Sequence, residues 1–382
     1  MKKMVIVVTV PLVLDTWFKD QPKYLSKFYE VEIITAFSHR VKSISEHENV
    51  NIKIMDFTRK INFIKDMKVL AQLFLYFMVK RPDIVYTLTP KAGLLGMMAS
   101  WMAFIPHRIH NVVGLPHLEA HGKRKTILEL SEKLTYIFST NLYCNSLNLK
   151  KDIENKMTKK PVKIIGHGSV NGVDTEYFKD MLSEDKKQDI RKSIEIEIDD
   201  FVITFVGRIV KDKGINELVN VFSALKLRHN NISLLLIGDY EDDLDPISSQ
   251  TKKIINEDPK ILQIDFQKDI RKYLAITNLF VLPSYREGLP NVLIEAGSYG
   301  IPLVATNING CNEIITNGEN GALVNKRDEN SLFTAIEKFI VDKEYYNYIK
   351  KNIRESIYKR YDQKIFFEKL HEEFISIEER SK

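Results

Sequence analysis

The chain has 382 residues, which is long enough for about two domains that each bury a complete core. Its apolar content of 44% and charged content of 28% are ordinary for a globular protein. The longest uncharged apolar stretch, residues 92–106, is shorter than the roughly 20 residues that cross a bilayer, which excludes an integral membrane protein.

The charge is divided unevenly along the chain. Residues 1–170 carry 26 Lys and Arg against 14 Asp and Glu, whereas residues 171–382 carry 30 against 37. A basic N-terminal half favours an anionic partner such as nucleic acid, a phospholipid surface or a phosphorylated acceptor. A solvated surface without such a partner is the alternative, and charge alone does not separate the two.

Two features indicate a cytoplasmic protein. Cys144 and Cys311 are too few for a disulfide framework, as expected in a reducing compartment. The lysines at the start of the chain and the apolar residues 4–14 resemble a signal peptide. However, residues 5–10 are largely β-branched, Pro11 interrupts the run, and no small-residue cleavage site follows, so we expect a first core strand.

Short β-branched runs alternate with helical segments in the N-terminal half. Several runs are apolar at consecutive positions, which is typical of parallel strands covered by helices on both faces. The expected strands are residues 4–10, 31–37, 51–57, 84–89, 108–113, 141–145 and 161–165. Residues 60–80 predict a helix that becomes almost entirely apolar, and Pro90 opens a second apolar helix over residues 94–104.

A second α/β series follows a hinge-like cluster of Gly and Asn at residues 166–172. Its expected strands are residues 201–206, 233–237, 279–282, 302–305 and 322–324. The pattern predicts two doubly wound, Rossmann-like α/β domains facing each other across a cleft. We assign residues 1–170 to the first domain and 171–362 to the second. Residues 363–382 hold a helix with one apolar side, expected to pack back toward the first domain.

Glu287 and Glu295 flank a predicted helix start. Pro290 fits the first helical position and Gly300 the position just past the end, so the helix opens immediately after Glu287. Free backbone N–H groups at such an opening attract phosphate. An acidic side chain at the same place implies a ligand with hydroxyls beside its phosphates, as in a nucleotide sugar.

A second phosphate signal follows the strand at residues 201–206. Gly207 permits a tight exit, Arg208 can bind a phosphate through two hydrogen bonds, Lys213 adds a point charge, and Gly214 lets the chain turn. Each cation alone could be an ordinary exposed residue. Both loops, however, leave the same edge of one predicted sheet, where ligands bind in doubly wound folds.

These residues belong to an ordered set of motifs that resembles the retaining glycosyltransferases of family 4, which have the GT-B fold. The resemblance covers nearly the whole chain and is most specific in its C-terminal half, where bacterial polysaccharide and glycan-assembly enzymes share it. The motifs are Asn171-Gly172-Val173-Asp174, Gly207-Arg208, Lys213-Gly214, Gly238-Asp239, Pro283-Ser284-Tyr285-Arg286-Glu287-Gly288, Glu295-Ala296, Pro302-Leu303-Val304-Ala305-Thr306 and Asn317-Gly318-Glu319-Asn320-Gly321.

The resemblance implies a role for each motif residue. Arg208 and Lys213 neutralise the donor diphosphate, Glu287 contacts the donor sugar, and Glu295 holds the ribose hydroxyls. The donor site is completed by Gly207, Gly288, Leu289, Pro290 and Asn291, with the base read by backbone near residues 264–268. In this family the departing phosphate oxygen can itself take the acceptor's proton, so no strong base is required.

The chain departs from the family pattern in two places. Val10-Pro11-Leu12 stands where many relatives have a Gly-Gly turn near the donor phosphate. Val113-Gly114 stands where many have His-Gly, with the histidine facing the donor sugar. His110 and His117 are the candidates to replace that histidine in catalysis; a surface or packing role is the alternative for each.

A metal site is not expected. Asp243-Leu244-Asp245 has the spacing of metal-dependent sugar transferases of a different fold, but it lies in an acidic surface loop. No zinc-type spacing of Cys and His occurs, and the glycine motifs of dinucleotide oxidoreductases and P-loop ATPases are missing from the sequence. We therefore expect neither a metal nor another cofactor.

We expect the N-terminal half to bind the acceptor. Its apolar helices and the basic cluster Lys123-Arg124-Lys125 fit partial insertion at an anionic membrane surface, with core packing as the alternative. We expect an enzyme at the inner face of the membrane that moves a hexose or N-acetylhexosamine from a UDP-linked sugar to a lipid-linked acceptor, as in capsule or lipopolysaccharide assembly, without nucleic acid. A nucleotide-sugar epimerase of the same fold and a noncatalytic nucleotide-sugar-binding regulatory subunit remain alternatives.

Overall fold

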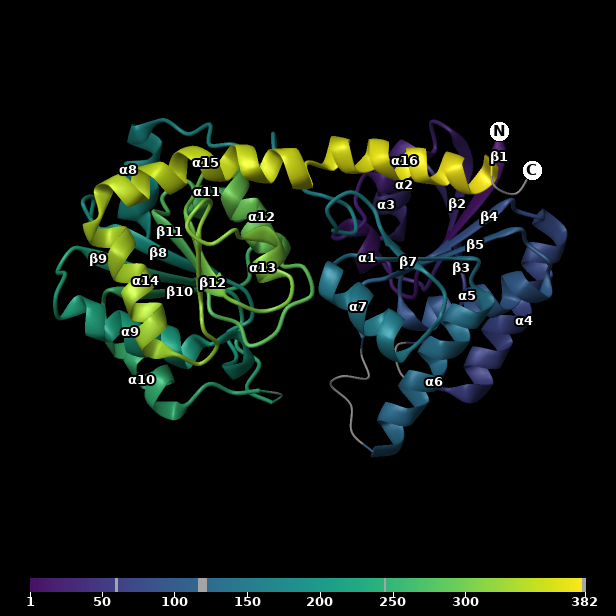
Figure 1. The fold of residues 1–382 in the computed structure, drawn as a ribbon, viewed down its shortest axis with the longest axis horizontal. Helices are drawn as coiled ribbons and strands as arrows, with labels where there is room; N and C mark the ends of the chain where they lie inside the picture. Colours follow the sequence, from purple (N-terminus) through teal and green to yellow (C-terminus); the bar gives the residue numbers. More distant parts are fainter. Residues whose placement is uncertain (59–60, 116–121, 244, 380–382) are drawn as a thin grey trace. The chain divides into compact units, whose positions relative to one another are not determined.

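The computed structural model describes residues 1–58, 61–115, 122–243 and 245–379, which form two compact units (Figure 1). Unit 1 comprises Met1–Gly172 and Gln363–Lys382, and unit 2 comprises Val173–Asp362. Unit 2 is thus one continuous stretch of chain, whereas unit 1 is assembled from both ends of the sequence.

Unit 1 is built on a parallel sheet of seven strands in the order β3-β2-β1-β4-β5-β6-β7. The strands are β1 (Lys2–Val7), β2 (Tyr29–Thr35), β3 (Asn51–Ile54), β4 (Ile84–Thr87), β5 (His107–Val112), β6 (Asn141–Cys144) and β7 (Val162–Ile164). The central strand β1 pairs with β2 on one side and with β4 on the other. Its consecutive apolar residues are buried because both faces of the sheet are covered.

Helices cover the two faces of this sheet (Figure 1). They are α1 (Leu12–Asp15), α2 (Gln21–Leu25), α3 (Val41–Glu48), α4 (Phe63–Lys80), α5 (Pro90–Met102), α6 (Gly122–Phe138), α7 (Leu147–Lys156) and α16 (Gln363–Glu379). Successive side chains of β1 point to opposite faces. Met4 and Ile6 share a core with Phe366 and Phe374 of α16, whereas Val5 packs in a core with α4 and α5.

Unit 2 is built on a parallel sheet of six strands in the order β10-β9-β8-β11-β12-β13. The strands are β8 (Phe201–Val206), β9 (Ile232–Ile237), β10 (Ile261–Ile264), β11 (Leu279–Leu282), β12 (Leu303–Thr306) and β13 (Ala322–Val324). Its helices are α8 (Glu184–Ser193), the 3-10 turn η2 (Lys211–Lys213), α9 (Ile215–Lys226), α10 (Ser249–Glu257), α11 (Arg271–Leu274), α12 (Asn291–Ser298), α13 (Cys311–Ile314), α14 (Glu329–Val341) and α15 (Lys343–Tyr361).

Both sheets reverse their strand order beside their first strand. The reversal lies between β1 and β4 in unit 1 and between β8 and β11 in unit 2. At such a point the loops after the two strands run in opposite directions and leave a crevice at the carboxyl edge, where ligands of doubly wound folds bind. The two sheets confirm the predicted α/β fold class, and they locate the crevice of unit 2 between the loops that carry its phosphate-type motifs.

The chain passes between the units twice, after Gly172 and after Asp362. Within each unit, the residues next to the two crossings are held together by hydrogen bonds. In unit 2, the Val173 N–H donates to the Tyr361 carbonyl at 2.9 Å, and the Thr175 hydroxyl donates to the Asp362 carboxylate at 2.5 Å. In unit 1, the side-chain amides of Asn171 and Gln363 donate to one carbonyl, that of residue 19, at 2.8 and 3.2 Å. The first and last residues of unit 2 therefore lie side by side.

Candidate active site

Gly214 fixes the loop after β8 against the loop after β11. It has a φ of 71°, and a Cβ added there would lie 2.2 Å from the Pro283 carbonyl oxygen, so only glycine fits. The two loops are also hydrogen-bonded, because the Tyr285 N–H donates to the Asp212 carbonyl at 2.8 Å. Arg286 adds an ion pair to the Asp212 carboxylate at 2.5 Å. The two loops of the crevice therefore form one joined structure.

Lys213 and Glu287 meet across this junction. The Lys213 ammonium donates to Glu287 Oε1 at 2.6 Å, and only 17% and 12% of the two side chains remain exposed. Removing two charges from water is costly unless they are paired, and each satisfies the other here. The carboxyl edge of the unit 2 sheet thus presents one cation and one carboxylate joined by a single hydrogen bond.

Helix α12 opens beside this pair. Pro290 has an extended conformation (ψ 103°) and is the N-cap, so the helix begins at Asn291, one residue later than the sequence predicted. No side chain caps its first turn within the part of the chain that the structure describes. Gly310 packs against the backbone just before this helix. A Cβ added to Gly310 would lie 1.9 Å from the Gly288 carbonyl oxygen. The first N–H groups of α12 can therefore receive an anion.

Glu295 lies one turn into α12, four residues after Asn291 and hence on the same side of the helix. It is half-buried, and no described residue makes a hydrogen bond or ion pair with its carboxylate. Burial raises the pKa of this carboxyl to about 7. A carboxylate in this state gains more from hydroxyl donors of a ligand than a solvated one does.

Arg208 is placed differently from Lys213. Its guanidinium donates to Glu241 at 2.6 Å, and 53% of the Arg208 side chain is exposed. Gly207 packs against the neighbouring loop, since a Cβ on Gly238 would lie 1.9 Å from the Gly207 carbonyl oxygen. The structure thus brings Lys213 and Glu287 together but leaves Arg208 in a surface ion pair. Such pairs are weak, so Arg208 can exchange Glu241 for a ligand at small cost.

Sequence reasoning gave no part in the site to Asp212 and Glu217, the partners of the motif residues Arg286 and Tyr285. Asp212 accepts from Arg286, and Tyr285 donates its hydroxyl to Glu217 at 2.5 Å. Cys311 is fully buried, and burial raises the pKa of its thiol, with Glu287 raising it further and Lys213 lowering it. The sequence could have indicated that Cys311 lies near the site, because it follows β12, and β12 is the strand next to β11.

His110 is buried inside unit 1. It lies on β5 and is 2% exposed, with Nδ1 2.7 Å from the Thr87 hydroxyl. Its ring fills the space above Gly93, where an added Cβ would lie 2.5 Å from Cε1. Burial lowers the pKa of His110 to about 3. These contacts favour the packing alternative for His110, and its catalytic part stays a prediction; His117 lies outside the described residues.

Two hydroxyls lie at the carboxyl edge of the unit 1 sheet, on Thr89 and on Thr9, the residue just before Val10-Pro11-Leu12. The Thr9 hydroxyl lies 2.7 Å from that of Thr89 and accepts from the Ala92 N–H at 3.2 Å, so it caps α5. Next to this cap, Lys91 pairs with Asp66 of α4 at 2.7 Å. Helix α5 is thus closed by protein groups, in contrast to the open start of α12.

The acidic loop after β9, which contains Asp243 and Asp245, is hydrogen-bonded to the loop after β8. The Asp245 carboxylate accepts from the Asp212 N–H at 2.7 Å, and Leu244 is outside the described residues. Within the described ranges, Asp20, His47 and Glu48 also come close enough to bind a metal ion. The oxygens of Glu48, however, accept from the N–H groups of Asp20 and Lys23 at 2.8 and 3.1 Å, which is the task of a helix cap.

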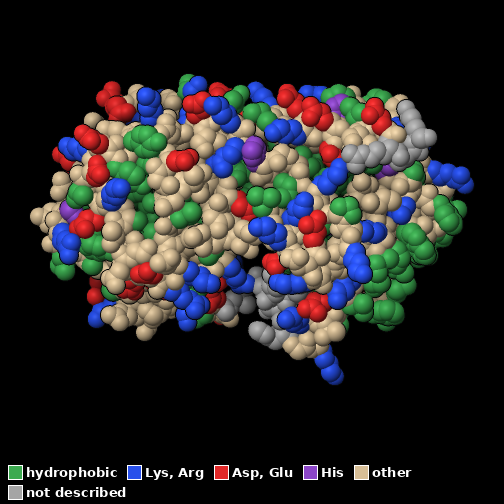
Figure 2. Space-filling view, viewed as in Figure 1, with side chains coloured by type: hydrophobic (Ala, Val, Ile, Leu, Met, Phe, Trp, Pro, Cys, Tyr) green, Lys and Arg blue, Asp and Glu red, His purple; other side chains and the backbone are tan. Residues whose placement is uncertain are grey.

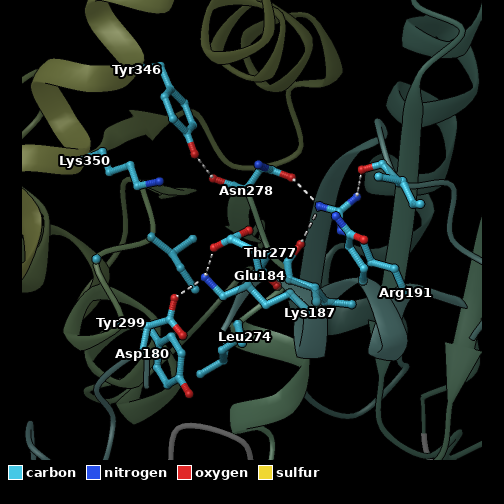
Figure 3. Close-up of a pocket in the computed structure, with 16 residues that line it drawn as sticks. Asp180, Glu184, Lys187, Arg191, Leu274, Thr277, Asn278, Tyr299, Tyr346 and Lys350 are labelled. Atoms are coloured by element: carbon cyan, nitrogen blue, oxygen red, sulfur yellow. Dashed lines mark hydrogen bonds and ion pairs between the residues drawn. The ribbon is translucent and has the colours of Figure 1, made fainter. Parts of the chain in front are cut away.

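A cavity of about 270 Å³ lies at the opposite, amino-terminal edge of the unit 2 sheet (Figure 3). Two of its cations, Lys187 and Arg191, are bound by protein groups. Lys187 binds Asp180 at 2.6 Å and Glu184 at 2.9 Å, and Arg191 donates to the carbonyl of Ile276 at 3.1 Å (Figure 3). The cavity therefore anchors α8 to the sheet and is separate from the crevice that holds Lys213.

Known proteins resemble this chain over most of its length. Residues 186–356 match a family described as Glycosyl transferases group 1. The capsular polysaccharide biosynthesis glycosyltransferase CapM of Staphylococcus aureus is 33% identical over 331 residues, which is 86% of each chain. The UDP-Gal:alpha-D-GlcNAc-diphosphoundecaprenol alpha-1,3-galactosyltransferase of Escherichia coli is 32% identical over 310 residues, 78% of this chain and 76% of its own.

Solved structures share the fold. Anabaena HepE in complex with UDP and glucose superimposes with a TM-score of 0.80 at 18% identity, covering 98% of this chain and 100% of that one. At this identity the likeness establishes the arrangement of the elements and leaves the chemistry to the residues of the site.

Proposed function

The chain belongs to the group 1 glycosyltransferases, and we propose that it moves a hexose or N-acetylhexosamine from a nucleotide sugar, UDP-linked, to a sugar hydroxyl with retention of configuration. The observation that carries this proposal is the Lys213–Glu287 pair beside the open start of α12. A nucleotide sugar has both the phosphates that a cation and free N–H groups attract and the hydroxyls that a carboxylate accepts from.

On binding, the donor would separate Lys213 from Glu287, because its diphosphate would bind Lys213 and its sugar would bind Glu287. Lys213 and the first N–H groups of α12 bind the diphosphate, and Arg208 joins them after leaving Glu241. Glu287, relieved of Lys213, accepts from hydroxyls of the sugar, and Glu295 accepts from the ribose. Gly207, Gly288, Leu289 and Asn291 form the walls at the carboxyl edge, and backbone after β10 reads the base.

Bond breaking in this arrangement is assisted by charge. The bond from the anomeric carbon to the diphosphate oxygen breaks while the acceptor oxygen bonds to the same face of that carbon. The acceptor proton passes to the departing oxygen, whose developing charge Lys213, Arg208 and the α12 dipole stabilise. These groups supply the counter-charge that a metal would otherwise provide, so we propose transfer without a metal.

The acceptor is a lipid-linked saccharide in this proposal. It is supported by the Escherichia coli relative, whose name gives UDP-Gal as donor and a diphosphoundecaprenol-linked GlcNAc as acceptor. The Staphylococcus aureus relative is a capsule enzyme by name. Assembly of a surface polysaccharide at the cytoplasmic face of a membrane fits both. None of the described helices is long and apolar enough to span a bilayer.

A panel of nucleotide sugars tests the proposal. The matching donor should raise the temperature of unfolding, because a ligand that binds only the folded state stabilises it. Lipid extract should then accelerate release of the nucleoside diphosphate, and the anomeric proton signals of the product should match those of the donor. If no member of the panel changes the unfolding temperature, the proposal fails. Sugar interconversion without acceptor would instead identify an epimerase, and binding without turnover a regulatory subunit.

A further inference from the structure

Helix α4 is apolar on two sides. Its inner side packs against the sheet of unit 1 through the buried residues Val69, Leu70, Leu73, Tyr76 and Phe77. Its outer side is exposed and carries Ile64, Met67, Leu75, Met78 and Val79. These outer positions recur at helical spacing along the length of the helix, so they form a stripe. A helix of a water-exposed protein surface would carry polar side chains there.

The stripe continues onto the two neighbouring helices. Trp101 of α5 and Ile137 of α6 are 51% and 62% exposed, and Phe104, just after α5, is 89% exposed. The rings of Trp101 and Phe138 lie 5.1 Å apart and join the ends of α5 and α6. Figure 2 shows this apolar area over α4 and α5. The outer apolar face consists of Ile64, Met67, Leu75, Met78, Val79, Trp101, Phe104 and Ile137.

Exposed lysines accompany the outer apolar face along α4. Residues 61–138 contain ten Lys and Arg against five Asp and Glu. Asp66 and Lys91 neutralise each other in an ion pair, and Glu132 is only 4% exposed. Lys65, Lys68 and Lys80 lie on α4 itself and are exposed. Long lysine side chains can lie along apolar surface and still place their ammonium groups among lipid phosphates.

We propose that the outer apolar face docks on an anionic lipid bilayer, with α4 lying in the plane of the interface. Helix α4 has 18 residues and is therefore about 27 Å long, and a stripe of that length with flanking lysines has the form of an interfacial helix. A second copy of the chain fits less well, because the same cations would face each other. Large exposed apolar areas of this kind mark interaction sites in water-soluble proteins.

The docked helix also reaches the ligand edge of unit 1. Helix α4 follows β3 and precedes the parallel strand β4, so its first turn lies at the carboxyl edge of the sheet. There Asp66 binds Lys91, the second residue of α5. An acceptor whose lipid tail stays in the bilayer would meet this edge at headgroup depth. This last step rests on the proposed function, whereas the docking itself does not.

Vesicle flotation tests the docking. The full-length protein is mixed with vesicles of phosphatidylcholine, with or without phosphatidylglycerol, and the floated fraction is measured. The test variant is Ile64→Ser, Leu75→Ser and Val79→Ser combined. The matched control replaces exposed apolar residues of unit 2, Ile198→Ser, Leu227→Ser and Val341→Ser. Unfolding temperatures of both variants show that they remain folded, as expected for exposed positions.

The wild type and the control should float with the phosphatidylglycerol vesicles, and the α4 variant should bind them at least about tenfold more weakly. Lys65→Gln with Lys68→Gln should weaken only the binding that depends on phosphatidylglycerol. Equal flotation of the α4 variant and the wild type would overturn the proposal. So would a wild-type dimer that the α4 variant converts to monomer without any vesicle binding, because the face would then belong to a second copy.

Transfer to a water-soluble acceptor separates this inference from the proposed function. The α4 variant should retain its release of nucleoside diphosphate with such an acceptor while losing vesicle binding. Intact vesicle binding by a protein that turns over no nucleotide sugar would leave the docking in place and refute the transferase proposal.

Discussion

The Lys213 ammonium and the Glu287 carboxylate hydrogen-bond at 2.6 Å between two loops that leave strands β8 and β11. These strands flank the reversal of strand order in unit 2, so the pair lies where a doubly wound sheet receives its ligand. In the free protein each charge compensates the other. A donor with an anionic and a hydroxyl-rich half would replace both partners at once.

Replacing Lys213 by Met should lower kcat/KM by about 100-fold or more, because the developing charge on the departing diphosphate loses its nearest cation. The neighbouring Lys211→Met, which changes an exposed lysine of the same turn, serves as control and should change kcat/KM little. Steady-state release of nucleoside diphosphate measures both. Near-wild-type kinetics in Lys213→Met would remove this residue from the mechanism.

Glu295 should make donor binding depend on pH. Burial raises the pKa of its carboxyl to about 7, and only the ionised form is a strong acceptor for ribose hydroxyls. Donor affinity should therefore increase as the pH rises through 7, and Glu295→Gln should bind donor more weakly with a flatter profile. Titration calorimetry over this pH range is the measurement. A profile unchanged by the substitution would contradict the ribose role.

Gly214→Ala should disrupt the site through the backbone. The φ of 71° and the approach of 2.2 Å to the Pro283 carbonyl oxygen both oppose a side chain, so we expect a loss of stability of about 2–4 kcal/mol together with activity. Gly300→Ala is the control, since its φ is 80° but nothing lies within 4 Å; it should cost about 1 kcal/mol. Urea denaturation compares the two, and equal losses would show that backbone strain alone is responsible.

Glu132 should make stability fall with rising pH. Burial raises the pKa of its carboxyl from 4.5 to about 7, with Tyr136 lowering it in part, and Oε2 has no hydrogen-bond partner. Because the folded state holds the proton more tightly, the contribution of Glu132 to stability is complete below pH 4.5 and is lost as the pH rises through 7.

Glu132→Gln should therefore raise the free energy of unfolding above pH 7 by on the order of 1–3 kcal/mol, with little effect below pH 4.5. Glu129→Gln, on the same helix but less buried, should show no such pH dependence. Urea denaturation at the two ends of the pH range is the measurement. A gain from Glu132→Gln that is the same at both ends would refute the assignment of the proton to this carboxyl.

Much of the fold could be predicted because buried parallel strands require runs of β-branched and apolar residues. The run at residues 201–206 became β8, and the apolar residues 363–379 became α16. Strand β10 was missed because Ile261-Leu262-Gln263-Ile264 is a short edge segment in which Gln263 breaks the apolar run. Edge strands bury less of their surface, so their sequences are under weaker constraint.

The proximity of Lys213 and Glu287 was predictable from the sequence, because both loops leave the same edge of one predicted sheet. Lys213 and Glu287 each follow a predicted strand, and their strands are neighbours. The pairing of Arg208 with Glu241 was not predictable, because it depends on two exposed side chains from separate loops. The buried surroundings of His110 were not predictable, because a strand buried on both faces gives no periodic signal of which side chains reach the ligand edge.

Unit 2 is one continuous segment, residues 173–362, whose first and last residues lie next to each other, so it could be replaced as a whole. A stretch of chain whose entry and exit are hydrogen-bonded to each other can be exchanged without rethreading its host. Ancestral or laboratory recombination at Gly172 and Gln363 could therefore pair one unit 1 with many versions of unit 2. Under the proposed function, the donor sugar could then vary while unit 1, the proposed acceptor side, stays unchanged.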